Sequence, residues 1–277
     1  MMKKMIIAWV LAVIITLSAA YYQRVTGPTY PKKITTNIRG IAYNFTLLRT
    51  HSSESDCEIS LPIDDNSVRG FMIFRKYYSK ENGNSAQNKW DTLSMKRVGD
   101  HMTAYLPKLP PAGKLEYYFL FRTGDHEYPV AQDKPVVIRY KGDVPPYVLI
   151  PHILFIFLAM LLSNLVGILG AFKVEKARMY MFITFGLLLI GGMILGPFVQ
   201  KFAFGEFWTG VPFGWDLTDN KTLIAFAAWV IALAANLKKF RPGYLIAAAI
   251  VTLAIFSIPH SMFGSELNHT TGTVTTG

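Results

Sequence analysis

The feature that most constrains this chain is a set of long apolar blocks without a charged residue. The hydrocarbon core of a bilayer is about 30 Å thick, and a helix of about 20 apolar residues, at the short end about 17, crosses it. Charged residues are costly within that core, so their absence is expected. The last two blocks approach this length with the help of flanking aromatic residues. We therefore predict a four-helix transmembrane domain over residues 147–262, built from residues 147–172, 179–198, 222–237 and 244–259.

A fifth apolar block, residues 5–20, follows the basic start Lys3-Lys4. Together with Ser18-Ala19-Ala20 it has the pattern of a cleavable secretory signal. It also suits an uncleaved anchor over residues 1–22, because Tyr21 and Tyr22 are typical of the aromatic belt at a membrane surface. Both interpretations place residues 21–146 outside the cytoplasm, and we favour the anchor.

The lysines and arginines of the short loops set the orientation, since they remain on the cytoplasmic side. Three basic clusters stand before residues 5–20, between residues 147–172 and 179–198, and between residues 222–237 and 244–259. The loop of residues 200–221 holds only Lys201 and Lys221, and no lysine or arginine follows His260. We predict a plasma (inner) membrane protein with five spans, a cytoplasmic N-terminus and an extracytoplasmic C-terminus. The clusters are Lys3 and Lys4; Lys173, Lys176 and Arg178; Lys238, Lys239 and Arg241.

Residues 35–143 alternate between short β-type runs and turn signals, without a stretch of helical period. Such spacing predicts a two-sheet antiparallel sandwich. The fold class is therefore an α+β membrane protein with an anchor helix, an extracytoplasmic antiparallel β-sandwich and a four-helix bundle. A polar tail, residues 263–277, ends the chain. The expected strands are residues 41–48, 57–61, 71–78, 90–95, 102–106, 115–121 and 136–140.

Part of this domain resembles fibronectin-III-like or other immunoglobulin-like sandwiches. The likeness covers residues 90–121 and rests on the turn Leu109-Pro110-Pro111-Ala112-Gly113, followed by a strand that bears tyrosines. Such domains mostly dock partners. We expect contacts with other membrane or extracytoplasmic proteins through this domain, in addition to the lipid bilayer.

The net charge of +10 is not a nucleic-acid signal, because the positive-inside clusters account for much of it. The single Cys57 excludes an internal disulfide, so the outer domain is held by its core. His51, His101 and His126 lie far apart without ligand spacing, which indicates surface or structural histidines.

The tripeptide Ile-Pro-His occurs twice, as residues 150–152 and 258–260. The predicted topology places His152 and His260 at the same outer face, and the aromatic loop of residues 205–221 lies between them in sequence. Neutral imidazole is an axial ligand of haem iron, so the pair could hold a haem or a metal. Alternatively, both histidines are interfacial residues without a ligand, and the loop is a re-entrant interfacial segment.

The loop resembles the tryptophan-rich loop of the cytochrome c maturation haem-handling proteins. Gly214-Trp215-Asp216, a threonine-bearing helix start and an apolar run with Trp229 inside it carry the likeness. The resemblance implies that Trp208, Trp215 and Asp216 cradle haem, and that His152 and His260 ligate its iron. Lys201 or Lys221 would then pair with the haem propionates. We also expect Asp219 to cap the following helix by accepting from the N–H of Lys221 or Thr222.

Two functions remain in consideration. The first is an integral membrane haem-binding, haem-handling or electron-transfer subunit with an extracytoplasmic docking domain. The alternative is a non-catalytic scaffold subunit of a membrane complex. A transporter is disfavoured because the apolar runs hold no aspartate, glutamate, lysine or arginine to mark a pathway. We see no nucleophile–base pair, phosphate loop or paired carboxylates, so an enzyme with chemistry of its own is not expected.

Overall fold

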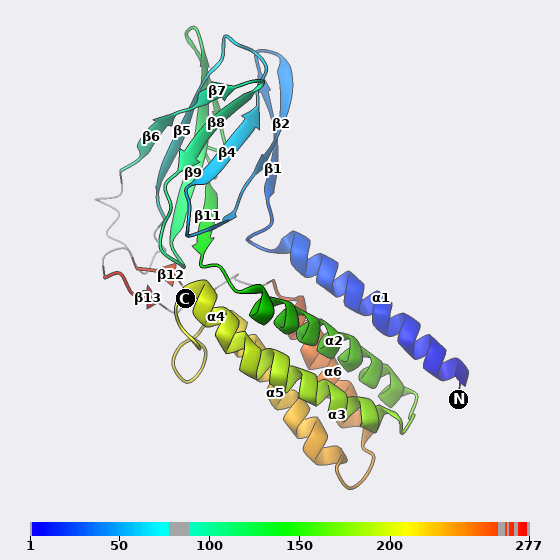
Figure 1. Ribbon diagram of the computed structural model, residues 1–277. Coiled ribbons are helices and arrows are strands. Elements are labelled where there is room, and N and C mark those ends of the chain that lie inside the picture. Colours follow the sequence, from blue (N-terminus) through cyan, green and yellow to red (C-terminus); the bar gives the residue numbers. More distant parts are fainter. Residues whose placement is uncertain (1, 78–88, 260–263, 265, 269–270, 276–277) are drawn as a thin grey trace. The chain divides into compact units, whose positions relative to one another are not determined.

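The computed structural model describes residues 2–77, 89–259, 264, 266–268 and 271–275, and it has a mixed α+β fold (Figure 1). The chain divides into two compact units. A helical unit comprises Met1–Pro28 and Val144–Ser265 together with the last two residues, and a sheet unit comprises Thr29–Asp143 and Glu266–Thr275. The expected combination of sheets with long apolar helices is therefore present.

Within the described part of the chain, four helical stretches are long and apolar enough to cross a membrane. The third of them is interrupted by a π-helical segment, η2, so that α3, η2 and α4 form one run over Ala177–Phe204. Helix α6 is apolar but has only 16 residues. The helical segments are α1 Met2–Thr26, α2 Pro146–Ala171, α3 Ala177–Leu188, η2 Leu189–Leu195, α4 Gly196–Phe204, α5 Leu217–Asn236 and α6 Pro242–Ser257.

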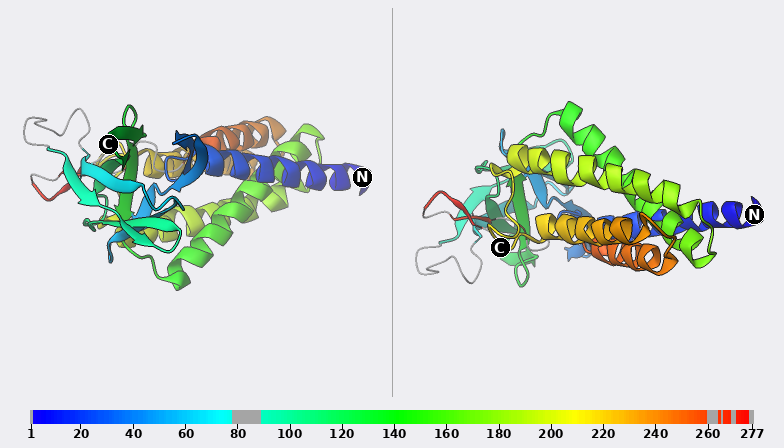
Figure 2. Two further views of the ribbon diagram at one scale, coloured as in Figure 1. Left: turned by 90° about the horizontal axis from the view of Figure 1, so that it is seen from above. Right: turned by 90° about the horizontal axis from the view of Figure 1, so that it is seen from below.

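Helix α1 packs against α2 through small side chains (Figures 1 and 2). Ala8 and Ala12 of α1 are fully buried. Asn164 Nδ2 of α2 donates to Thr16 Oγ1 of α1 at 2.9 Å, a buried bond between the two helices. Helix α1 is thus an integral element of the helical unit. Its packing agrees with the anchor interpretation of residues 1–22, which stays a prediction.

Helices α2 and α6 pack along the small-residue stripe of α2. Ala159 and Ser163 are buried, and a Cβ atom on Gly167 would lie 2.6 Å from the Cβ of Ala249. Only glycine permits that approach between the two helices. Ala171, four residues further along α2, is exposed.

Helices α5 and α6 are joined by a buried bond between their side chains. Trp229 Nε1 donates to Thr252 Oγ1 at 2.9 Å, and both residues are fully buried. Trp229 therefore belongs to the interior of the helical unit.

The sheet unit contains three sheets built from residues before Gly142, and all of the seven expected strands are present. The larger sheet has the order β3-β11-β9-β5-β6, with β10 paired to β9; the others are β4-β8-β7 and β1-β2. The strands are β1 Lys32–Ile38, β2 Ile41–Leu47, β3 Thr50–Ser52, β4 Cys57–Pro62, β5 Arg69–Lys76, β6 Asp91–Ser94, β7 Lys96–Val98, β8 His101–Leu106, β9 Lys114–Thr123, β10 His126–Val130 and β11 Val136–Lys141.

One strand pair departs from the expected antiparallel arrangement. Strand β3 runs parallel to β11, with Thr50 opposite Arg139. β3 has only three residues, and it lies at the edge of the larger sheet next to β11. All other pairs among the described strands are antiparallel.

Alternating apolar residues of the strands form one core in the sheet unit. Tyr117, Phe119 and Phe121 of β9 are fully buried at every second position, as the period of a strand requires. Cys57 lies in this core as a free cysteine. Burial raises the pKa of its thiol to about 11, and burial also raises the pKa of Tyr117.

The tail after α6 returns to the sheet unit, where β12 (Glu266–Leu267) pairs with β13 (Val274–Thr275). Leu267 N donates to Ala112 O at 3.1 Å. Glu266 Oε2 lies 2.9 Å from Lys114 Nζ, in an ion pair with side chains only 8% and 18% exposed. The segment expected to be a polar tail thus contributes a hairpin to this unit.

Candidate functional site

His152 lies on the second turn of α2, because the helix begins at Pro146. Pro146 occupies the first turn of the helix, where the missing N–H costs nothing, and Pro151 lies inside the helix. The His152 ring is half-buried, and its Nδ1 lies 2.9 Å from Gly191 O of η2. A carbonyl accepts only, so Nδ1 carries the proton. In the neutral ring Nε2 is then the nitrogen with a free lone pair.

Glycines of η2 bring this segment against α2 and α5. A Cβ on Gly191 would lie 2.8 Å from Phe155 Cβ, and one on Gly192 would lie 2.8 Å from Thr222 Cγ2. Gly191 O also accepts from the N–H of Gly196, the residue five positions later. π-helical segments occur frequently at functional sites. Here the segment supplies the acceptor that orients His152.

The loop between α4 and α5 is held by the first turn of α5. Asp219 is buried, and its Oδ2 accepts from Thr209 N at 2.6 Å and from Gly210 N at 3.2 Å. Asn220 Oδ1 accepts from Val211 N at 2.8 Å. These bonds fix the loop backbone over residues 209–211.

Asp216, and not Asp219, is the N-cap of α5. Its Oδ1 accepts from Thr218 N at 2.8 Å. The prediction that Asp219 caps this helix was wrong, because the helix begins at Leu217, five residues before the apolar run that we had used to place it. Asp216 is 2% exposed, so its carboxylate lies below the loop surface.

The aromatic residues of the loop differ in their surroundings. Trp208 Nε1 donates to Val211 O within the loop. Trp215 is 76% exposed and Phe213 is 79% exposed. The roles of Trp208, Trp215 and Asp216 in holding a cofactor stay predictions. Trp215 is exposed enough to meet another molecule, whereas Trp208 is partly buried.

Lys221 binds the C-terminal end of α6. Although it is only 1% exposed, its Nζ donates to Ile258 O at 2.8 Å and to Pro259 O at 3.3 Å. An ammonium is favourable at a helix C-terminus, where carbonyls lack partners within the helix. Pairing with a propionate would require Lys221 to leave these carbonyls. The sequence shows Lys221 directly before an apolar run, but it does not indicate the partners Ile258 and Pro259, which lie far away in the chain.

His260 lies outside the described residues, and Pro259 is the last described residue before it. A path of contacts connects the surroundings of His152 to this point. His152 bonds to Gly191, Gly192 packs on Thr222, and the neighbouring Lys221 holds Pro259. The segment that leads to His260 is therefore at the end of the helical unit that also contains His152.

The remaining histidines of the described chain belong to the sheet unit. His101 and His126 are exposed. His51 is partly buried, with its ring edge-on to Tyr140 and its Nε2 3.3 Å from Ser55 Oγ. None of the described residues forms a group of three or more metal-ligating side chains.

Comparison of the chain with protein-family models, with curated proteins and with solved structures gives no match. Inference about function therefore depends on the geometry of the site.

Proposed function

We propose that the protein is an integral membrane haem-binding subunit in which His152 and His260 would hold the iron. The observation that carries this proposal is the bond between His152 Nδ1 and Gly191 O. Histidines that bind metals usually donate their other ring N–H to a carbonyl or carboxylate, which fixes the ring and raises the basicity of the ligating nitrogen. His152 has this arrangement, and among the described residues its ring makes no second hydrogen bond.

Gly196 lies beside the imidazole of His152. A Cβ built on Gly196 would make ordinary van der Waals contact with Gly191 O, at 3.8 Å, and with the His152 ring, at 3.9 Å. The path of contacts to Pro259 supports convergence of the two histidines. Bound between them, a haem would supply one-electron chemistry or would itself be the cargo that is handled.

We further propose that α1 and the four helical stretches after residue 143 cross the plasma (inner) membrane, with the N-terminus cytoplasmic and the immunoglobulin-like sandwich and the C-terminus outside. The bond of Leu267 to Ala112 supports this, because it requires an even number of crossings between them. Helix α6 must then span as well. Its 16 residues measure about 24 Å at 1.5 Å per residue, so Ile258 and Pro259 would complete the crossing.

A second candidate is a non-catalytic scaffold subunit of a membrane complex. The exposure of Phe213 and Trp215, on a loop that Asp219 fixes, favours it. Such a surface would meet a neighbouring protein, with the sandwich as the extracytoplasmic docking domain.

The optical spectrum of the purified protein separates the two candidates. We expect a Soret band that shifts on reduction and that is lost or weakened in His152→Ala. The matched control His126→Ala replaces an exposed histidine of the sheet unit and should retain the spectrum. Protein that stays colourless after expression with added haem would reject the haem proposal and leave the scaffold.

The topology is tested by labelling with a membrane-impermeant maleimide in a Cys57→Ala background. Thr271→Cys should react from the outside of intact cells, whereas Glu175→Cys, in the loop between α2 and α3, should react only after permeabilisation; both residues are exposed. The opposite labelling pattern would show that the protein has the reverse orientation in the membrane.

A further inference from the structure

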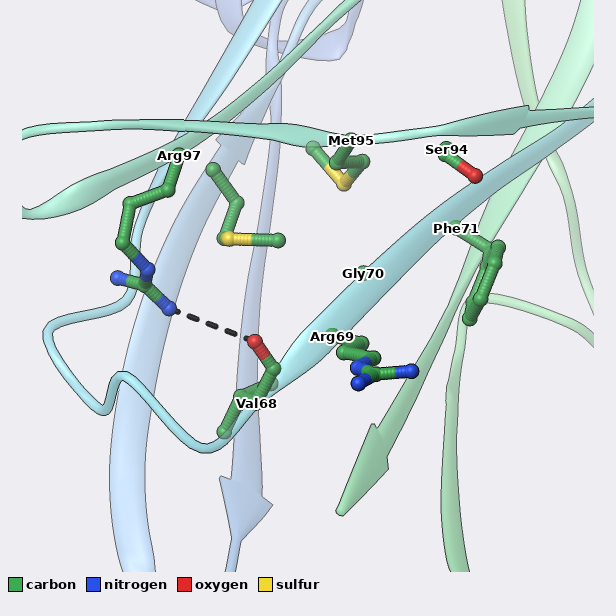
Figure 3. Close-up of a pocket in the computed structure, with 8 residues that line it drawn as sticks. Val68, Arg69, Gly70, Phe71, Ser94, Met95 and Arg97 are labelled. Carbon is green, nitrogen blue, oxygen red and sulfur yellow. Dashed lines mark hydrogen bonds between the residues drawn. The ribbon is translucent and has the colours of Figure 1, made fainter. Parts of the chain in front are cut away.

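An open pocket of 470 Å³ lies in the sheet unit, where β5 and β6 of the larger sheet meet β7 and β8 (Figure 3). All of its lining residues belong to that unit, so an inference from it does not rest on the haem proposal. Its lining combines apolar side chains with two arginines: Val68, Arg69, Gly70, Phe71, Ser94, Met95, Arg97 and Met102.

The apolar part of the pocket surrounds Gly70. A Cβ at this position would lie 3.0 Å from Met95 Sδ, 3.1 Å from Met102 Cε and 3.1 Å from a ring carbon of Phe121. The side chains of Met95 and Met102 therefore pack closely over Gly70, where a larger residue would displace them, and they form an apolar wall of the pocket. Methionine is flexible and polarizable, so it adapts to apolar ligands of irregular shape.

The charged part consists of Arg97 and Arg69. Arg97 donates to the carbonyls of Ile63 and Asp65 at 2.6 and 2.7 Å, and to the Val68 carbonyl as Figure 3 shows. These carbonyls fix the guanidinium without neutralising its charge. Arg69 stands opposite Arg122 in the register of β5 and β9, and like charges directly opposite one another repel.

Neighbouring carboxylates are already engaged. Asp64 accepts from the hydroxyl of Tyr43 at 2.9 Å. Asp65 accepts from Arg39 and Ser67. In the described part of the chain neither arginine of the pocket has a carboxylate within salt-bridge distance. The positive charge at the rim is therefore available to a ligand.

We propose that this pocket binds an apolar group that ends in a carboxylate. The apolar portion would lie against Met95 and Met102, and the carboxylate would pair with Arg69 at the rim. The same chemistry occurs in a short alkyl carboxylate and in the apolar C-terminus of a polypeptide.

The test uses the full chain in nanodiscs of neutral lipid, with ¹³C-labelled methionine methyl groups. The Met95 and Met102 signals are assigned by Met→Leu variants. Two pairs of probes are added: hexanoate against hexanol, and a tripeptide ending in leucine as the free acid against its amide. We expect saturable shifts of both methyl signals with the acids and much weaker binding of hexanol and the amide. The acid that binds with the higher affinity shows whether the pocket prefers a short alkyl carboxylate or the C-terminus of a polypeptide.

Substitutions separate charge recognition from apolar packing. Arg69→Gln should weaken binding of the acids about tenfold or more, the scale of a charge-assisted hydrogen bond. The matched control Lys96→Gln removes an exposed charge next to Arg97 and should have little effect. Unchanged signals of the other methionines show that each variant is folded. The absence of saturable shifts, equal binding of hexanol and hexanoate, or equal affinity in the two variants would overturn the proposal.

Discussion

Breaking the ion pair between Lys114 and Glu266 should destabilise the sheet unit by about 2 kcal/mol. Removing one partner of a fully buried pair costs about 3–5 kcal/mol, because a charge is left without compensation. The pair here is 18% and 8% exposed with an N–O distance of 2.9 Å, so water relieves part of that cost. Glu266→Gln keeps the shape of the side chain while removing its charge.

The single cysteine provides the assay. Cys57 is fully buried, so a maleimide reaches it only when the sheet unit opens. When the unit closes faster than the thiol reacts, the labelling rate follows the opening equilibrium. A loss of about 2 kcal/mol should therefore accelerate labelling of the full chain in nanodiscs about 30-fold.

An exposed pair in the same unit is the matched control. Arg122 and Glu127 are 50% and 51% exposed. Such pairs contribute about 0–1 kcal/mol, so Glu127→Gln should change the rate by less than about fivefold. The double variant Lys114→Met with Glu266→Leu should recover part of the lost stability. Equal rates for Glu266→Gln and Glu127→Gln would refute this account of the tail.

Three further predictions concern other parts of the chain. Folding raises the pKa of Cys57 from 9.0 to about 11, so its contribution to stability is complete below pH 9 and declines as pH rises through 11. In denaturant unfolding at pH 7, 9 and 10.5, the free energy of unfolding should decline less steeply with pH in Cys57→Ala than in the unsubstituted protein. An identical decline in both proteins would contradict this. Asn164→Leu removes the bond to Thr16 and should cost about 0.6–1.7 kcal/mol, measured by unfolding of the full chain in detergent micelles, whereas no loss would mean that the bond is not formed. Asp219→Ala removes the acceptor of Thr209 N, so protease cleavage within residues 205–216 should accelerate about tenfold, and an unchanged rate would show that other contacts hold the loop.

Much of the fold could be predicted because periodicity is a local signal. The aromatic and apolar run of residues 115–121 in β9, bounded by turn signals, indicates a strand without reference to its partners. Strand β1 was missed because it is mostly polar: it consists of two lysines, two threonines, an asparagine and two isoleucines. Exposed and partly buried residues alternate along most of it, so no clear apolar face appears in the sequence. The β12–β13 hairpin was missed because its bonds to Ala112 and Lys114 depend on residues far away in the chain.

The candidate site was less predictable for the same reason. His152 was singled out by the repeated tripeptide, but nothing near it in sequence indicates Gly191 as its partner. Two aspartates precede the apolar run of α5, and aspartate suits a cap at either position. Only the position at which the helix begins decides between Asp216 and Asp219.

The return of residues 266–275 to the sheet unit has a consequence for biogenesis. Ribosomes make the chain from its N-terminus, so the strands before Gly142 are synthesised and can pair long before the last helix is complete. Glu266 arrives only after α6, and until then Lys114 lacks its carboxylate partner. The sheet unit therefore gains its hairpin only after α6 has been synthesised, and a nascent chain that stalls within α6 would carry a sheet unit without β12 and β13.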